Sequence, residues 1–147
     1  MAFTGNFTCN AFKLGLPAKQ FSFATGTTDV YKIAIYTNAA TLNATTASYT
    51  AVGEVVASGY TAGGSTLVVN QVPVIGVADN VQVCYWSFAN AAFNAAFTAR
   101  GALIYKADGL TNPTVCVLDF GADKTSQTTF TVQFPTASAT TAIIRLI

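Results

Sequence analysis

Hydrophobic and polar residues alternate along much of this chain with a period of two, which is typical of β-strands that bury one face. In residues 30–36, Ile33 and Ile35 share one face and Lys32 lies on the other. The same reasoning predicts short strands at residues 20–23, where Phe21 and Phe23 alternate with polar neighbours, and at 66–69, 81–88, 97–105, 115–120, 128–134 and 142–146. Residues 53–56 are expected to pair locally, and residues 90–96 are ambiguous.

One segment has helical periodicity instead. Within residues 6–15, Phe7, Ala11 and Leu14 recur at helical spacing, and Gly15 followed by Pro17 supplies a stop. We therefore expect a short helix there, in an N-terminal helix or arm that covers residues 1–19.

Turn residues separate these elements. Residues 25–29, the pair Gly63-Gly64 and residues 108–109 predict tight turns, because glycine accepts the positive φ that such turns need. Pro73 and Gly76 are expected to separate strand 66–69 from strand 81–88, and residues 37–48, 121–126 and 135–139 read as loops, the first with room for one helical turn. Gly101 predicts a β-bulge in its strand.

About eight short strands at regular spacing indicate an all-β protein, an antiparallel β-sandwich or a small barrel, with the sandwich favoured. The chain has 147 residues, which suits one domain over residues 1–147, and no internal repeat is visible.

The composition is poor in charge. Hydrophobic residues make up 52% and charged residues only 9%, against about 25% in typical proteins. No apolar run approaches the roughly 20 residues of a membrane-spanning helix, so we expect no membrane partner. A surface of uncharged polar and apolar groups suits a subunit that packs against others, so we expect a homo-oligomer. The alternative is an extracellular β-domain.

Several partners and modifications are not indicated by the sequence. The net charge is +1 with no basic cluster, so direct nucleic-acid binding is not expected. The first residues lack the features of a signal peptide. The cysteines are odd in number and form no C-x-x-C pair, so we expect Cys9, Cys84 and Cys116 to be reduced thiols. The glycosylation patterns that begin at Asn6 and Asn43 are attributed to chance.

No catalytic site, metal site or cofactor site is predicted, and the chain is not expected to be an enzyme. Histidine is absent, which removes the usual general base. Asp119 and Asp123 are the closest pair of acids, but Asp123 lies beside Lys124 in a segment that reads as a turn. Gly59 and Gly64 have phosphate-loop spacing, but serine follows where lysine is required.

Two further features leave alternatives open. Arg100 interrupts an apolar strand, and it can be a snorkelling or edge residue, pair with Asp119, or contact another subunit. Tyr85, Trp86 and Phe88 can stack on sugar rings in a lectin-like module, but their strand pattern favours packing in a core.

Taken as a set, the blocks "NAFKLGL", "DVYKIAIYTNAATLNATT", "GEVVASGYTAGG", "FTARGALIYKADG", "VCVLDFGADK" and "FTVQFPTASATTAIIRLI" span nearly the whole chain. This succession resembles small virion structural proteins of tailed bacteriophages. The resemblance implies synthesis in the host cytoplasm, a place in the virion and other virion proteins as partners. We expect a capsid decoration or cement protein, with a head–tail connector, collar or tail component as the alternative. A carbohydrate- or receptor-binding module is less favoured.

Overall fold

Strands dominate the fold. The computed structural model describes residues 3–147, in which ten strands and one short helix are present. In chain order these elements are β1 (Phe7–Thr8), α1 (Asn10–Gly15), β2 (Tyr31–Tyr36), β3 (Ser65–Leu67), β4 (Val69–Ala78), β5 (Val81–Phe88), β6 (Ala91–Phe93), β7 (Phe97–Lys106), β8 (Thr114–Ser126), β9 (Phe130–Val132) and β10 (Ile144–Leu146). The predicted all-β class is confirmed, with ten strands in place of about eight.

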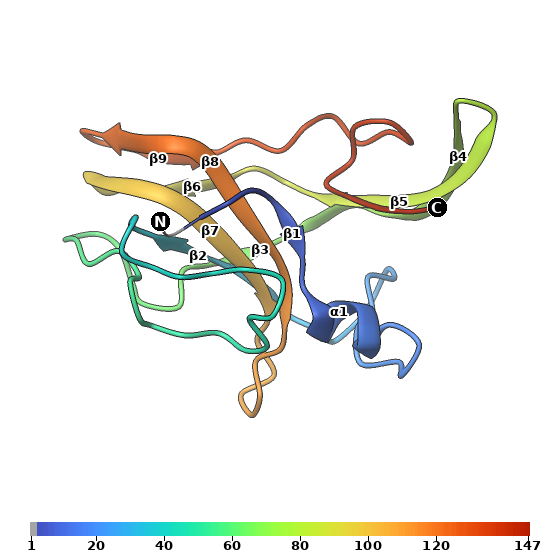
Figure 1. The fold of residues 1–147 in the computed structure, drawn as a ribbon, viewed down its shortest axis with the longest axis horizontal. Coiled ribbons are helices and arrows are strands. Elements are labelled where there is room, and N and C mark those ends of the chain that lie inside the picture. The colour runs from blue at the N-terminus through green and yellow to red at the C-terminus, as the bar shows by residue number, and fades with distance from the viewer. Residues whose placement is uncertain (1–2) are drawn as a thin grey trace.

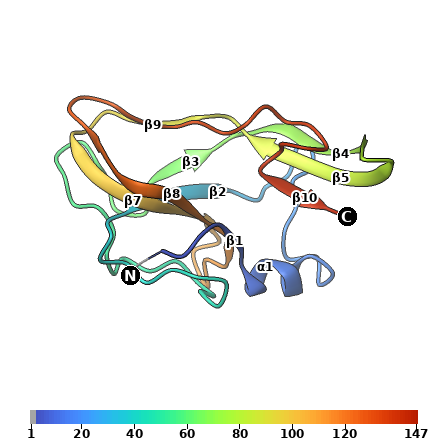
Figure 2. The same ribbon diagram turned by 45° about the horizontal axis from the view of Figure 1, so that its top comes forward.

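The strands form a sandwich-like arrangement of antiparallel sheets. A five-stranded sheet has the order β1-β8-β7-β2-β3, a three-stranded sheet has the order β10-β5-β4, and β6 pairs with β9. Figure 2 shows β5 and β9 in one layer and β2, β7 and β8 in the layer beneath it. One hydrophobic cluster fills the space between these layers, with β5, β6, β9 and β10 facing the five-stranded sheet.

The five-stranded sheet is buried on both faces. On β2, Ile33 and Ile35 belong to the cluster between the layers. Ala34 and Tyr36, which point the other way, belong to a second cluster with Phe3 from the N-terminal segment and residues of the 37–49 segment. The predicted strand at 30–36 is thus confirmed, and its second face is also buried.

Aromatic rings fill the main cluster. Phe23 stacks on Tyr31 with ring centroids 4.5 Å apart and lies 5.1 Å from Trp86. Trp86 is only 2% exposed and Phe88 is equally enclosed, so their predicted packing role is confirmed, while Tyr85 is half-buried. Phe21 is buried too, but the strand predicted at 20–23 is wrong: this segment is irregular, because its rings are anchored in the core without a neighbouring strand to pair with.

The N-terminal helix is shorter than the periodicity predicts. Phe7 and Thr8 form β1 and pair with Val117 and Cys116 of β8, so the helix starts only at Asn10. The predicted apolar stripe is also wrong, because Leu14 is 75% exposed and Phe12 is the large side chain that the helix buries.

The prediction that Pro73 and Gly76 separate two strands is wrong. Both lie within β4, and the chain reverses at Asp79 and Asn80, whose φ angles of 50° and 63° suit a two-residue hairpin turn. Pro73 is tolerated because β4 is an edge strand and its pairing with β5 is irregular between Gln71 and Val74.

Other loop predictions also need correction. Residues 121–126 belong to β8 instead of a loop: residues 124–126 pair with residues 97–99 of β7, and residues 120–123 lie at the register shift between these pairs and the rest of the ladder. Residues 90–96 contain β6, and residues 37–48 contain no helical turn. Residues 53–56 do pair locally, through a single bridge between Tyr36 and Glu54.

Glycine residues occur at a register shift of the sheet and at a turn that packs closely against β2. The bulge predicted in the strand of Gly101 is wrong in its position: the register shifts between Ala99 and Gly101, but the extra residues lie on β8, between Asp119 and Lys124. Gly63 and Gly64 form the predicted turn, with φ angles of 88° and 73°. A Cβ atom at Gly64 would overlap the backbone carbonyl of Ile33, so the turn is pressed directly against β2.

This packing predicts unequal effects of two glycine substitutions. Gly64→Ala combines positive-φ strain with a backbone overlap, whereas Gly109→Ala meets open space at a similar φ of 74°. We expect Gly109→Ala to cost about 1 kcal/mol and Gly64→Ala at least about 2 kcal/mol more. Chemical denaturation measures both, and equal losses of unfolding free energy would contradict the packing described for Gly64.

Candidate interaction surface

The two acids considered for catalysis are held by different partners. The Arg100 guanidinium donates from Nε to Asp119 Oδ1 at 3.0 Å, and Asp123 accepts a hydrogen bond from the Asn38 amide at 2.9 Å. The hydrogen bond from Arg100 is the main cause that lowers the pKa of Asp119. Of the alternatives for Arg100, the ion pair with Asp119 is therefore confirmed.

The remaining reactive groups are dispersed. Among residues 3–147, no three His, Cys, Asp or Glu side chains gather where they could hold a metal ion. Cys9 and Cys116 are buried, which raises the pKa of both thiols, and Cys84 is half-buried on β5; all three are free. No helix within the described part of the chain is long and apolar enough to cross a membrane.

A buried carboxylate that the sequence analysis missed lies under the 49–63 segment. Glu54 is 7% exposed and accepts hydrogen bonds from the Tyr49 hydroxyl at 2.6 Å, the Tyr60 hydroxyl at 2.7 Å and the Gly63 amide at 2.8 Å. The Tyr60 oxygen in turn accepts the amide of Ile35 on β2. Burial is the main cause that raises the pKa of Tyr60, with Glu54 adding to it.

This arrangement is structural, because all three donors lie in the same 49–63 segment as Glu54 and hold that segment in its folded shape. The carboxylate satisfies three donors, and the bridge between Glu54 and Tyr36 fixes the segment to β2. The sequence signal was slight: a single glutamate, the only one in the chain, beside Val55 and Val56.

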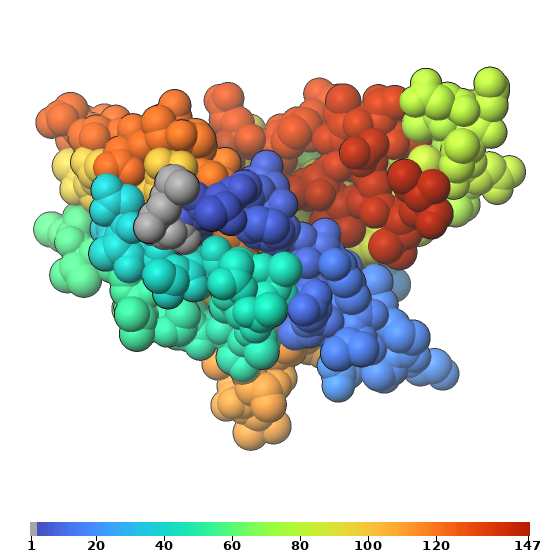
Figure 3. Space-filling model, in the orientation of Figure 1, coloured from blue at the N-terminus to red at the C-terminus, as the bar shows by residue number. Residues whose placement is uncertain are grey.

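Two surfaces remain that are not explained by the packing of the chain itself. The first is the β4–β5 hairpin, which we call the arm; it forms one end of the molecule in Figure 1 and a projecting knob in Figure 3. Its exposed apolar residues, with Val68 just before it, are Val68, Val72, Val74, Ile75, Val77 and Val81. Neighbouring residues of a strand point to opposite faces, so the exposure of both Val74 and Ile75 means that β4 is uncovered on both faces at this point, although Val83 of β5 is buried.

The arm also has an open edge. β5 lies between β10 and β4, so β4 is the edge strand of its sheet. Unpaired backbone groups and exposed apolar side chains are thus combined along one strand, and natural proteins usually avoid this combination unless a partner covers it. Asp79, at the turn, is the only charged residue of the arm.

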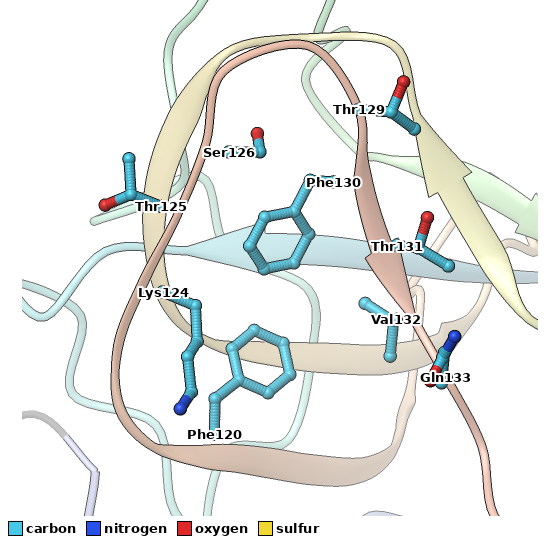
Figure 4. A pocket seen from close by; sticks show the side chains of 9 residues that line it. All are labelled: Phe120, Lys124, Thr125, Ser126, Thr129, Phe130, Thr131, Val132 and Gln133. Atoms are coloured by element: carbon cyan, nitrogen blue, oxygen red, sulfur yellow. The ribbon is translucent and has the colours of Figure 1, made fainter.

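The second surface is a hollow between β8 and β9, on the open side of the sandwich. Its volume is about 470 Å³. Phe120, Phe130 and Val132 contribute apolar surface, and Lys124 and Gln133 lie at its edge with several threonines and Ser126 (Figure 4). Phe120 and Phe130 lie with ring centroids 5.8 Å apart. Sequence reasoning missed the hollow because it placed residues 121–126 in a loop.

The hollow continues along the molecule. A neighbouring depression shares Phe120, Val132 and Gln133 with it and extends to Phe134 and Ile143. β1 pairs only with Val117 and Cys116 of β8, so the edge of β8 beyond Val117 has no strand beside it on this side. Neither surface assembles a set of groups for acid–base or nucleophilic chemistry among the described residues.

Comparison with known proteins gives no further guide to the role of these surfaces, because no protein-family model, curated protein or solved structure matches the chain.

Removing the buried carboxylate is expected to destabilise the fold strongly. Glu54→Ala leaves two tyrosine hydroxyls and the Gly63 amide without their acceptor, so we expect a loss of about 3 kcal/mol or more of unfolding free energy. Glu54→Gln keeps the size and one acceptor oxygen, so its loss should be smaller. Thermal or denaturant unfolding measures this difference, and wild-type stability of Glu54→Ala would refute the role assigned to the carboxylate.

Proposed function

We propose that this protein is a non-enzymatic structural subunit of a tailed-bacteriophage virion, and more specifically a capsid decoration or cement protein. The observation that supports this most is the arm, whose apolar side chains and strand edge are exposed in the isolated chain. A subunit that is covered by its neighbours in a particle has no need to protect such a surface with charge.

The low charge of the chain supports the same proposal. Only 9% of residues are charged, and two of the basic side chains, Arg100 and Lys106, are used in internal ion pairs with Asp119 and Asp29. Weak contacts repeated over a symmetric particle add up to stable attachment, so no single strong site is required. The resemblance of the sequence blocks to virion structural proteins gives the proposed location.

The alternative is a ring component of the neck or tail. One observation favours it: the arm and the turn between β8 and β9, where the hollow lies, are at opposite ends of the molecule (Figure 1), and this placement suits packing around a ring. Both positions are compatible with a homo-oligomer that contacts other virion proteins and requires neither cofactor nor metal.

Copy number in purified particles tests the proposal and separates its two forms. Quantitative mass spectrometry should find the protein in mature particles. Hundreds of copies per particle would favour decoration of the shell, and roughly six or twelve would favour the neck or tail. Absence from purified particles would refute the proposed function.

Substitutions in the arm should abolish incorporation without unfolding the protein. Ile75→Thr with Val77→Thr keeps β-branched residues in the strand but removes apolar contact from side chains that are 59% and 66% exposed. A loss of about 2 kcal/mol of binding free energy would raise the dissociation constant of each subunit contact roughly 30-fold.

Leu110→Thr is the matched control, because Leu110 is 90% exposed on a turn outside the arm. Copy number per particle is the readout, and the melting temperature of each purified variant verifies folding. Equal incorporation of the arm variant and the control would show that the arm makes no contact in the particle.

A further inference from the structure

We propose that the arm of one copy docks into the β8–β9 hollow of a second copy, so that the protein associates head to tail with itself. This inference rests on the proposed function and deepens it by naming the partner that covers the arm. It joins the two surfaces that the packing of the single chain leaves unexplained.

The placement of the two surfaces favours contact between copies. The longest axis of the molecule is horizontal in Figures 1 and 2, and in both views the tip of the arm and the β8–β9 turn lie at opposite ends of it. An arm therefore cannot reach the hollow of its own chain. A contact between two different patches of identical subunits repeats from copy to copy, and it closes into a ring or continues as a filament.

The apolar surfaces are complementary in kind. The arm presents Ile75 and Val77 on an exposed strand, and the hollow is lined by the half-buried Phe120 with the buried Phe130 and Val132 beside it. Aliphatic side chains inserted into the hollow would cover the exposed part of Phe120. The contact would be favourable in free energy, because it removes apolar area of both copies from water.

The backbone edges are complementary as well. β4 has no neighbouring strand on its outer edge. On the edge of β8 that faces away from β7, β1 pairs only with Val117 and Cys116, so the rest of that edge has no neighbouring strand. A strand that is added at an open sheet edge forms main-chain hydrogen bonds while its side chains enter adjacent pockets. The arm supplies the strand, and the open side of the sandwich supplies the edge and the pocket.

Charge selects a second copy as the occupant. Asp79 is the only charged residue of the arm and lies at its tip, and Lys124 is the only charged residue that lines the hollow. Within residues 3–147 the ion pairs are Arg100 with Asp119 and Lys106 with Asp29, so Asp79 and Lys124 are both unpaired. Each copy thus carries an acid on the arm and a base at the hollow, and docking brings the opposite charges together.

Charge reversal tests this pairing in the purified full-length protein. Asp79→Lys or Lys124→Asp alone should weaken self-association by about tenfold or more at low salt, and the double variant should restore it. Sedimentation velocity over a concentration series measures the dissociation constant. Asp79→Asn, which suits the positive φ of 50° at this position, should give a smaller weakening without reversing the charge.

Lys19→Asp is the control, because Lys19 is exposed, lies outside both surfaces and also has a positive φ, of 59°. It should leave self-association unchanged. Thermal unfolding of every variant verifies that the fold is retained.

A zero-length carbodiimide cross-link supplies the geometric test. In an equal mixture of ¹⁴N- and ¹⁵N-labelled protein, mass spectrometry should find Asp79 joined to Lys124 in peptides that combine a light and a heavy chain. Wild-type protein that stays monomeric throughout the series, or single reversals that associate as the wild type does, would overturn the inference.

The result also separates this inference from the proposed function. If the charge reversals leave self-association unchanged while Ile75→Thr with Val77→Thr still prevents incorporation into particles, a different virion protein covers the arm. The inference is then wrong and the proposed function stands. If the wild-type protein associates through Asp79 and Lys124 but is absent from particles, the proposed function is wrong and the head-to-tail contact stands.

Discussion

Burial of both faces of the five-stranded sheet is the constraint on which the rest of the structure depends. A sheet whose β2 presents Ile33 and Ile35 on one side and Ala34 and Tyr36 on the other must be covered twice. Strands β5, β6, β9 and β10 cover one side, and the N-terminal segment with residues 37–49 covers the other. The segment that contains Glu54 has little regular structure of its own, and hydrogen bonds to Ile35 of β2 and from Tyr105 of β7 fasten it to the sheet.

The need to bury the five-stranded sheet also explains which parts of the layer packed on it stay exposed. Trp86 and Phe88 of β5 reach the core, whereas Val81 at the start of β5 and most of β4 stay exposed. At the opposite end a hollow lies between β8 and β9, where Phe120 is only half-buried. The layer that packs on the five-stranded sheet thus leaves apolar groups exposed at both of its ends, in the arm and in the hollow. These exposed groups are the physical basis of the proposed assembly.

The sequence allowed the fold class, the central strands and the turn at Gly63-Gly64 to be predicted, because these depend on local alternation and on glycine. It could not show that residues 121–126 continue a strand, since that depends on the length of β7 alongside them. The turn at Asp79 and Asn80 was missed because Pro73 and Gly76 were the more obvious breakers. The role of Glu54 and the hollow depend on contacts between distant segments, which no local pattern contains.

The central claim is that the exposed edge of β4 is covered by a neighbouring subunit in the assembled state. Hydrogen exchange of the backbone amides of β4, compared between isolated protein and the assembled particle, tests it most directly. The account predicts that amides between Val74 and Ala78 that exchange rapidly in the isolated protein become strongly protected on assembly. Unchanged exchange of these amides in a particle that contains the protein would contradict it.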